Sequence, residues 1–346
     1  MERIILHIDM DCFFAQIEER ENPQFKGRPL VVGSDPKGGS GRGVVSTANY
    51  IARKYGIHSA LPISQAFRLC PEAVFLPVNF GLYERVSENI FGILRKYSER
   101  VETVSLDEAY LDLSYLNGFK EGEKVAREIK NEILEKEKLT STIGLGSNKA
   151  IAKIAVNQAK PNGLKVVLPE EAEAFLNHLE VEEIPGIGPK KVEELEKRGI
   201  RKVSELKELG REKLRELFGK AGETIYGRIR GKDEEEVSLK NIIKSLGREH
   251  TFEKDTRDPE IIFKVFDGIV EYIWEELGKK NLSFKTLTVV CRYQGFETHT
   301  RSLTLKEKER NFRIFKRESK KMLLKFLISS PKLIRLIGLR VICLEK

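Results

Sequence analysis

The chain has 346 residues, enough for two or three compact domains that each bury a core. Hydrophobic residues make up 40% of the chain and charged residues 33%, which excludes a disordered chain and a membrane-embedded one. No apolar run approaches the roughly 20 residues that span a bilayer, and the first residues lack the layout of a signal peptide, so we expect a cytoplasmic protein.

The net charge of +8 is concentrated in the last third of the chain. From residue 246 to the end there are 22 Lys and Arg against 14 Asp and Glu, whereas the preceding residues hold 39 of each sign. A local excess of this kind is typical of a module that binds a polyanion, because each Lys or Arg that meets a phosphate releases condensed counterions. A charge-rich solvated surface gives the same pattern, so charge alone leaves both interpretations open.

The four cysteines, Cys12, Cys70, Cys291 and Cys343, are widely separated and form no C-x-x-C pair. This spacing argues against a zinc site and against a disulfide framework. We therefore expect reduced, structural thiols.

Hydrophobic periodicity predicts an α/β unit over the first half of the chain. Strands are expected at 3–8, 44–47, 101–106, 109–113 and 140–145, and helices from about residue 12 and at 48–55, 63–70, 80–98, 123–138 and 149–159. The glycine-rich run 37–43 is expected to be a mobile loop, because no Gly-Lys-Ser/Thr follows as in a P-loop. Residues 107 and 108 fall between two extended runs, which predicts a hairpin with acids at its tip.

The second half changes character at residue 169. Residues 169–232 are charged and divided by glycines, which predicts short helices joined by glycine turns, and the polar stretch from 233 to 244 is expected to be a linker that buries little. The last unit is expected to contain helices at 258–278 and 311–328 and strands from about 245 and at 284–292, 298–305 and 334–344. Four strands with two helices on one face would leave the other face of the sheet free.

Three acids stand at the ends of predicted strands. Asp9 follows an apolar strand, and Asp107 and Glu108 lie between two strands rich in Val and Leu. A desolvated carboxylate needs a cation, and carboxylate oxygens suit Mg²⁺, which in pairs activates a hydroxyl and stabilises a leaving pyrophosphate. Taken singly, these acids are as compatible with caps and turns. Asp11 is expected to cap the following helix rather than to bind a metal.

A second set of residues suits a triphosphate. Tyr50 and Arg53 are three residues apart on one face of a predicted helix, Thr47 lies a turn earlier, and Lys160 precedes Pro-Asn-Gly. Arg binds phosphate through two hydrogen bonds and Lys binds it as a point charge. The set is weak by itself, because Tyr and Arg are common on exposed helices.

The segment from Ile184 to Lys191 has the pattern of a helix-hairpin-helix. Gly186 and Gly188 allow a tight turn whose N–H groups, at a helix start, can hold a DNA phosphate without reading sequence. Ile187 and Lys190 belong to the same motif. An ordinary turn between helices is the alternative interpretation.

Together these motifs resemble those of the Y-family DNA polymerases, the translesion enzymes of the DinB or DNA polymerase IV class, and archaeal members in particular. The segments that carry the resemblance are IDMDCFFA at 8–15, TANYIAR at 47–53, SLDEAYLD at 105–112, AKPNG at 159–163 and PGIG at 185–188. The resemblance covers residues 1 to about 233 strongly. The last hundred residues match in the order of their predicted elements and in their basicity more than in their residue identities.

The resemblance implies an α/β (α+β) multidomain fold shaped like a right hand. Its parts would be a catalytic palm at 1–10 and 79–168, fingers at 11–78, a helix-hairpin-helix thumb at 169–232, a linker at 233–244 and a DNA-binding little finger at 245–346. The little finger would contain four strands and two helices. The whole is expected to act as a monomer.

The resemblance also implies roles for individual residues. Two Mg²⁺ ions would be held by Asp9, Asp107 and Glu108, the catalytic acids, with the carbonyl of Met10. The incoming nucleotide would be bound by Phe13, Phe14, Thr47, Tyr50, Arg53 and Lys160. Phe14 would be the steric gate beneath the deoxyribose, a position where many archaeal relatives have Tyr. The nascent base pair would be roofed by the small residues Gly43, Val44 and Ser46, and DNA would be contacted by Gly186, Ile187, Gly188 and Lys190.

The expected activity is template-directed addition of dNMP to a primer 3′-hydroxyl with release of pyrophosphate. We expect low fidelity, bypass of damaged bases and no proofreading, with primer-template DNA and dNTP as partners. Relatives often carry a clamp-binding tail, but here the chain ends at the last predicted strand, so contact with a sliding clamp would lie elsewhere or outside this chain. A two-metal helix-hairpin-helix nuclease shares the acids but has no use for the triphosphate set. A non-catalytic DNA-binding protein would need the acids to be chance.

Overall fold

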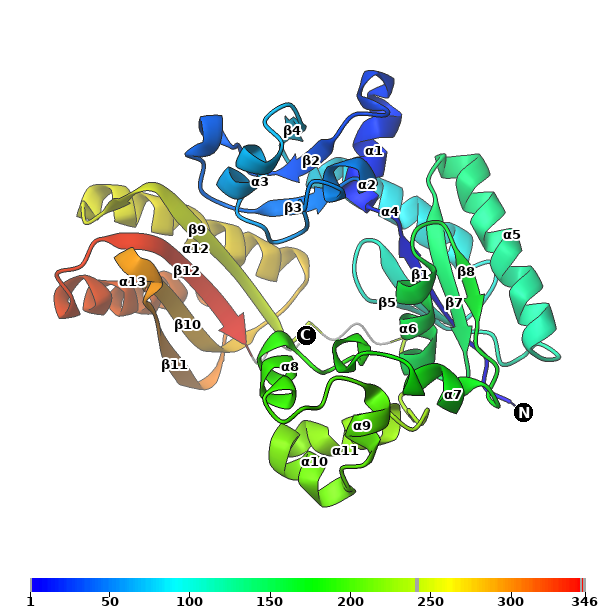
Figure 1. The fold of residues 1–346 in the computed structure, drawn as a ribbon. Coiled ribbons are helices and arrows are strands. Elements are labelled where there is room, and N and C mark those ends of the chain that lie inside the picture. The colour runs from blue at the N-terminus through cyan, green and yellow to red at the C-terminus, as the bar shows by residue number, and fades with distance from the viewer. Residues whose placement is uncertain (1, 240–242, 343, 345–346) are drawn as a thin grey trace. The chain divides into compact units, whose positions relative to one another are not determined.

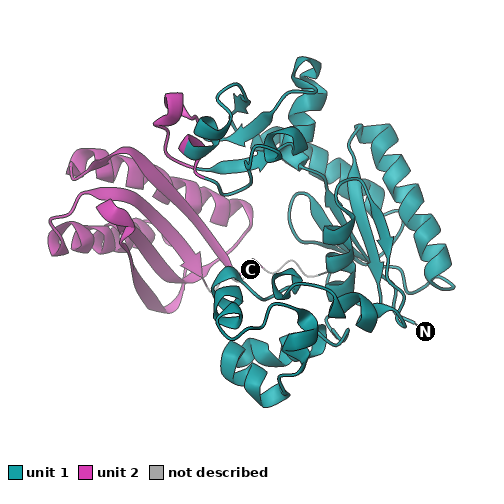
Figure 2. Ribbon diagram, viewed as in Figure 1, with its two compact units in different colours: residues 1–34, 44–61, 65–241 teal, residues 35–43, 62–64, 242–346 magenta. Residues whose placement is uncertain are grey.

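The computed structural model describes residues 2–239, 243–342 and 344. The chain forms two compact units: residues 1–34, 44–61 and 65–241 make the first, and residues 35–43, 62–64 and 242–346 make the second (Figure 2). Within the described residues, each helix is too short or too polar to cross a bilayer. Cys12, Cys70 and Cys291 are free and buried as predicted, whereas Cys343 lies outside the described residues.

A five-stranded sheet forms the base of the first unit, with β1 at its centre (Figure 1). Its strands, in spatial order, are β5 (Val101–Thr103), β6 (Glu108–Asp112), β1 (Ile5–Met10), β7 (Ser141–Gly146) and β8 (Leu164–Val166). Neighbouring strands are antiparallel except β7 and β8, which are parallel. Every residue of β1 is buried, as an apolar run that forms a central strand requires.

The two faces of β1 have different partners, because side chains alternate along a strand. Ile4, Leu6, Ile8 and Met10 belong to the main core with helices α4 (Phe80–Leu94) and α5 (Phe119–Glu137). The opposite face carries Ile5, His7 and Asp9 and packs against helix α6 (Lys149–Ala159). A Cβ on Gly144 of β7 would lie 2.2 Å from the Ala152 carbonyl of α6, so this glycine allows the helix to approach the sheet closely.

The predicted hairpin differs from the observed one. Strand β5 ends at Thr103 and β6 begins at Glu108, so the turn comprises 104–107 and Glu108 is a strand residue rather than a tip residue. The reason is its pairing, since Glu108 lies opposite Asp9 of β1. Helix α4 also ends four residues earlier than predicted, and α5 begins four residues earlier.

A smaller sheet of three strands follows the order β3-β2-β4. Its elements and the neighbouring helices are β2 (Leu30–Gly33), β3 (Val45–Ala48), β4 (Val74–Leu76), α1 (Phe13–Glu21), α2 (Tyr50–Arg53) and α3 (Ile63–Leu69). Strands β2 and β4 were not predicted, because three or four residues are too few to show a period. The expected turn of helix after Ala48 is present as α2, whose N-cap Asn49 accepts a hydrogen bond from the Ala52 N–H.

Short helices follow residue 169, as the glycine pattern predicted. They are α7 (Ala172–Asn177), α8 (Pro189–Glu196), α9 (Val203–Lys207), α10 (Arg211–Phe218) and α11 (Gly222–Arg228), and they share a core with Ile151 and Ile154 of α6. The predicted linker was expected to bury little, but it contains a buried apolar side chain. Val237, 5% exposed, packs with Ile5, Tyr110 and Ala152.

The second unit contains an antiparallel sheet of order β11-β10-β12-β9 with two helices on one face (Figure 1). Its elements are β9 (Ser245–Thr256), α12 (Pro259–Lys279), β10 (Phe284–Tyr293), β11 (Thr298–Glu309), α13 (Phe312–Ser329) and β12 (Ile334–Ile342). The prediction of four strands and two helices is confirmed. On the sheet, Thr286 and Thr288 of β10 share hydrogen bonds of 3.1 and 2.9 Å with Thr304 and Ser302 of β11.

Candidate active site

Two of the three predicted catalytic acids lie side by side on adjacent strands. Asp9 of β1 is the register partner of Glu108, the first residue of β6. Asp9 is 6% exposed, and Glu108 is half-buried. Both belong to the face of the sheet that α6 covers. Pairing of two strands has therefore brought together acids that are a hundred positions apart in sequence.

Asp107 and Met10 flank this pair. The N–H of Met10 donates to the Asp107 carbonyl at 2.9 Å, which joins the ends of the two acid-bearing segments. The Asp107 carboxylate accepts a hydrogen bond from the Ser105 hydroxyl within the turn. Burial raises the pKa of Asp107, and the Ser105 hydrogen bond opposes that shift. Within the described residues the Asp107 side chain makes no hydrogen bond to the pair, but the charge of Glu108 adds to the rise in its pKa.

Three lysines of α6 and its C-terminus face the acids of the sheet. Lys153 Nζ lies 2.8 Å from Glu108 Oε2, and Lys160 Nζ lies 2.7 Å from Asp9 Oδ1. One turn before Lys153, Lys149 Nζ lies 2.9 Å from Glu102 of β5. Positions 149, 153 and 160 project from the same side of the helix. We call these residues the lysine row.

The lysine row and the local burial shift the pKa values of the two acids in opposite directions. Burial raises the pKa of Asp9 to about 7, against the stabilising charge of Lys160. The His7 imidazole and the Lys153 ammonium beside it lower the pKa of Glu108. His7 is 1% exposed, and its Nε2 is 3.7 Å from Glu108 Oε2. Burial and the neighbouring charges thus move the pKa values of two adjacent carboxyls apart.

The donor set is of the kind that a divalent cation binds. Carboxylate oxygens are the hard ligands that Mg²⁺ prefers, and Asp9, Glu108 and the neighbouring Asp107 supply them. In the described part of the chain, however, no three His, Cys, Asp or Glu side chains are arranged to hold a metal ion. The structure places the Asp9 and Glu108 carboxylates next to each other. Asp107, the residue before Glu108, is the third candidate ligand, and its carboxylate accepts a hydrogen bond from Ser105.

The Asp11 carboxylate accepts hydrogen bonds from other parts of the chain and does not cap α1. Residue 12 is the N-cap of α1, and no side chain caps that helix, so the prediction that Asp11 is a cap is wrong. Cys12 has a positive φ of 37°, and Asp11 is 1% exposed. Its carboxylate accepts hydrogen bonds from Thr140, Thr142 and the Asn162 N–H.

The predicted steric gate is an aromatic ring held by other rings. Phe14 is half-buried and stacks on Tyr83 with a centroid distance of 4.2 Å and an angle of 12°, and Phe80 contacts it edge-on at 6.1 Å. The Tyr83 hydroxyl donates to Glu18 at 2.7 Å, which fixes the stacking ring. Phe13, by contrast, is 2% exposed and its side chain belongs to the core, and its contact with the nucleotide stays a prediction.

The predicted phosphate ligands Thr47, Tyr50 and Arg53 gather around the start of α2. Thr47 is on β3, and Arg53 lies over the Tyr50 ring with its Cζ 4.7 Å from the centroid. Arg53 Nε donates to the Ala48 carbonyl at 2.9 Å, which leaves its two terminal amino groups for other partners. The buried Tyr50 hydroxyl has no hydrogen-bond partner within the described residues. An orphaned hydroxyl beside an exposed guanidinium suits an anionic ligand.

The predicted roof residues have little side chain to offer. Gly43 and Val44 are exposed, and Ser46 is half-buried. Gly43 has a φ of +116°, a backbone conformation that a larger residue rarely adopts. The segment therefore presents a small surface at this position.

The predicted helix-hairpin-helix turn is present, and Arg228 donates a hydrogen bond to its Pro185 carbonyl. Gly186 has a φ of +104°, and Gly188 is the N-cap of α8. Both glycines and Lys190 are exposed. Ile187 is buried and its N–H donates to the Ile184 carbonyl at 3.0 Å, so this residue helps to fix the turn, and its contact with DNA stays a prediction.

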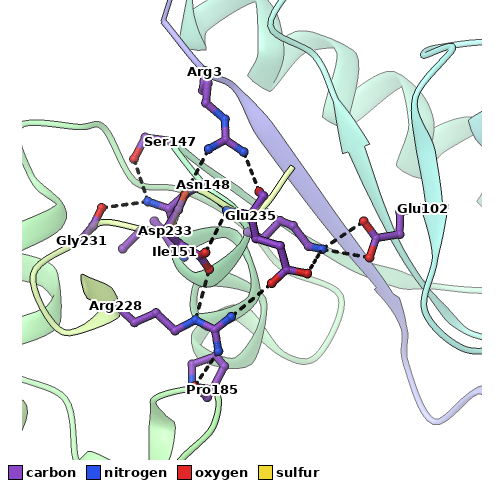
Figure 3. Close-up of polar contacts among 11 residues, drawn as sticks. Arg3, Glu102, Ser147, Asn148, Ile151, Pro185, Arg228, Gly231, Asp233 and Glu235 are labelled. Carbon is purple, nitrogen blue, oxygen red and sulfur yellow. Dashed lines mark hydrogen bonds and ion pairs between the residues drawn. The ribbon is translucent and has the colours of Figure 1, made fainter. Parts of the chain in front are cut away.

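Arg228 connects this turn to a network of charges on the linker and the sheet (Figure 3). It donates to the Pro185 carbonyl at 3.0 Å and pairs with Asp233 at 3.2 Å and Glu235 at 3.3 Å. Glu235 also pairs with Lys149 at 2.7 Å. Arg3 donates to the main-chain carbonyls of Asp233 and Glu235 at 3.1 and 2.7 Å. We call these contacts the linker network.

Sequence reasoning missed His7, Lys149, Lys153 and Arg228. Lysines on a helix and an arginine at a helix end are usually solvated, so their types carry no signal. The spacing of 4 and 7 residues in the lysine row is the one sequence feature that marks a common side of α6. His7 was detectable only as a polar residue inside an apolar strand.

Three family models match the chain. Residues 8–157 match the impB/mucB/samB family, residues 243–346 match the C-terminal domain of that family, and residues 182–233 match the thumb domain of DNA polymerase-iota. The DNA polymerase IV of Methanoculleus marisnigri is 45% identical over 343 residues, covering 99% of this chain and 95% of that protein. The DNA polymerase IV 2 of Methanosarcina mazei is 45% identical, over 98% of this chain and 92% of its own.

Solved structures show the same similarity. The Y-family DNA polymerase chimera Dbh-Dpo4(243-245)-Dbh has a TM-score of 0.90 at 34% identity over 98% of both chains. The insertion ternary complex of Dbh DNA polymerase has a TM-score of 0.69, and DinB from Sulfolobus solfataricus has one of 0.66, each at 34% identity over 98% of both chains. Sequence and fold therefore agree on one group of proteins.

Proposed function

Because the chain belongs to the Y-family of DNA polymerases, in the DNA polymerase IV (DinB) class of translesion enzymes, we propose that Asp9, Asp107 and Glu108 form its polymerase centre. The protein is thus a DNA-directed DNA polymerase, and members of this family generally use divalent metal ions. The observation that supports the assignment of residues is the pairing of Asp9 with Glu108 across β1 and β6.

Two Mg²⁺ ions are the proposed cofactors, bound by these three carboxylates and the Met10 carbonyl. When bound, such ions lower the pKa of the attacking hydroxyl and stabilise the pyrophosphate that leaves. The ion pairs of Glu108 with Lys153 and of Asp9 with Lys160 support a site where negative charge is concentrated and must be balanced.

The incoming dNTP is proposed to lie between α2 and Lys160. Arg53 has two amino groups free for phosphate oxygens once Nε is bound to Ala48, and the unpartnered Tyr50 hydroxyl can donate to a phosphate oxygen. Lys160 would exchange Asp9 for the triphosphate as a mobile point charge. Thr47 on β3 would complete the set.

The reaction transfers the α-phosphorus of the dNTP to the primer 3′-oxygen. One P–O bond forms to that oxygen, the bond between the α-phosphorus and the bridging oxygen breaks, and the 3′-hydroxyl proton is released. The residues of the chain position both reactants and balance charge, which is the main protein contribution in phosphoryl transfer. Phe14, held by Tyr83, would exclude a ribose 2′-hydroxyl.

The properties that go with this centre follow from the small residues at 43, 44 and 46. A roof with few side-chain atoms imposes little shape on the nascent pair, so we propose low fidelity and bypass of damaged bases, without proofreading. The exposed hairpin glycines, Lys190 and the positively charged last third are proposed to hold primer-template DNA through its phosphates. The enzyme is proposed to act as a monomer.

A primer-extension assay tests the proposal. A labelled primer-template is incubated with dNTP and Mg²⁺ and with the parent protein, Asp107→Ala or Glu99→Ala, the last being an exposed acid outside the site. We expect extension by the parent and by Glu99→Ala and none by Asp107→Ala. Shortening of the primer would support the nuclease alternative. A gel shift without either product would support the non-catalytic DNA-binding alternative.

A further inference from the structure

The carboxylate of Asp11 is fully occupied by the chain itself. Its Oδ1 accepts from the Thr142 hydroxyl at 2.7 Å, and its Oδ2 accepts from the Thr140 hydroxyl at 2.8 Å and from the Asn162 N–H at 2.9 Å. The residue is 1% exposed. Both oxygens thus have donors, and one of the donors, Thr142, is the register partner of Asp9 across β1 and β7.

The Asn162 hydrogen bond fixes the loop that carries Lys160. Lys160 is the C-cap of α6, and its N–H donates to the Val156 carbonyl at 3.1 Å. Two residues on, the backbone is held by Asp11, and Lys130 Nζ reaches Asn162 Oδ1 at 3.1 Å. The backbone on both sides of Lys160 is therefore immobilised, by the helix before it and by Asp11 after it.

We propose that Asp11 is a positioning residue that aims Lys160 at the incoming triphosphate. This inference rests on the proposed function, in which Lys160 is a triphosphate ligand. A lysine on four flexible bonds loses side-chain entropy when it holds a ligand, and a fixed backbone reduces the further loss. Release of the loop lowers the local concentration of the ammonium group near the phosphates and so weakens dNTP binding.

Conservative substitution separates this role from metal binding. In Asp11→Asn, the oxygen can still accept from Asn162 and Thr140, and the amide can donate to the Thr142 hydroxyl, which accepts as readily as it donates. We therefore expect Asp11→Asn to extend a primer at a rate within about threefold of the parent. Asp9→Asn, which removes a carboxylate from the proposed centre, is the comparison variant and is expected to be inactive.

Direct nucleotide binding provides the second measurement. The dissociation constant of dNTP is measured on a complex with dideoxy-terminated primer and template, from the fluorescence of 2-aminopurine in the template. We expect Asp11→Ala to raise this constant about tenfold, as loss of one immobilised side chain implies. Thr142→Val removes a hydrogen bond to Asp11 but keeps the one from Asn162, so it is the matched control and is expected to stay within about twofold. Thermal unfolding verifies that each variant is folded.

A double-mutant cycle with Lys160→Ala identifies the path of the effect. If Asp11 acts through Lys160, Asp11→Ala adds little once Lys160 is gone. An equal loss in both backgrounds would show that Asp11 acts elsewhere, and loss of extension by Asp11→Asn, like that of Asp9→Asn, would make it a metal ligand; either result overturns the inference. Should Asp11→Ala not fold, the same cycle is run with Asp11→Ser, which removes the carboxylate that accepts from the Asn162 N–H but keeps a polar group in the buried position. Failure of the proposed function differs, because the parent itself would then not extend the primer.

Discussion

Lys149→Met is expected to destabilise the first unit and to release the linker from it. Lys149 is 5% exposed, and its ammonium group makes hydrogen bonds of 2.9 and 3.0 Å to Glu102 and of 2.7 Å to Glu235. It also lies 4.9 Å from the centroid of the Tyr110 ring. Methionine keeps roughly the length of the stem but leaves Glu102 without its lysine and Glu235 with Arg228 as its remaining partner.

The magnitude follows from the exposure of the partners. Loss of one member of a buried ion pair costs about 3–5 kcal/mol, and an exposed pair contributes less than about 1 kcal/mol. The Glu102 side chain is 20% exposed and that of Glu235 is 55% exposed, so solvent compensates part of the loss. We therefore expect a decrease of about 2–3 kcal/mol in the free energy of unfolding, which for a unit of this size lowers Tm by roughly 5–10 °C.

Two measurements test the estimate. Calorimetry gives the Tm of each unfolding transition, and limited proteolysis reports cleavage in the segment from 232 to 239, which should become faster. Lys136→Met is the matched control, because Lys136 is 52% exposed and pairs with Glu132 on the surface of α5. If both variants lowered Tm equally, or if cleavage of the segment were unchanged, the linker network would not hold the linker as we reason.

Other variants test separate parts of the site. Phe14→Ala is expected to increase incorporation of rNTP relative to dNTP by tenfold or more, on the order of 1.4 kcal/mol of lost discrimination; primer extension with each nucleotide measures the ratio, and an unchanged ratio would refute the gate. Arg228→Gln removes the charged donor to the Pro185 carbonyl. We expect the Kd for primer-template to rise several-fold and kcat at saturating DNA to stay unchanged. Arg230→Gln is the control, because the carbonyls that Arg230 binds lie outside the hairpin. Gly144→Ala is expected to cost about 2–4 kcal/mol of stability, because its methyl group would lie 2.2 Å from a carbonyl of α6; a Tm within 2 °C of the parent would contradict the close packing of helix and sheet.

Sequence patterns predicted the helices and the long strands better than the short ones. An apolar run that stops at an acid identified Asp9, and alternation identified β10 and β11. Strands β2, β4 and β8 have three or four residues, too few to show a period, and the equally short β3 was predicted from its place between a glycine-rich run and a helix. Glu108 was predicted at a hairpin tip because a turn and a strand start look alike locally, and its true place depends on pairing with β1.

The partners of the site residues were beyond prediction, because tertiary packing selects them. Lys153 and Glu108 are 45 positions apart, and Asp11 and Asn162 are 151 apart. Asp11 was expected to cap α1, but the positive φ of Cys12 turns the chain so that the cap position falls to the next residue. Val237 sits in a segment whose charges predict a solvated linker, and only the folded sheet provides the apolar site that buries it.

The lysine row has a mechanical consequence. Its first and last members are 11 residues apart, roughly 16 Å along the axis of α6 and its end. Lys149 meets the linker network, and Lys160 meets Asp9. Since a helix is stiff over this length, α6 keeps the backbone positions of Lys149 and Lys160 at a fixed separation. The two ends of one helix thus bring positive charge to two separate places, the linker network at Lys149 and Asp9 at Lys160.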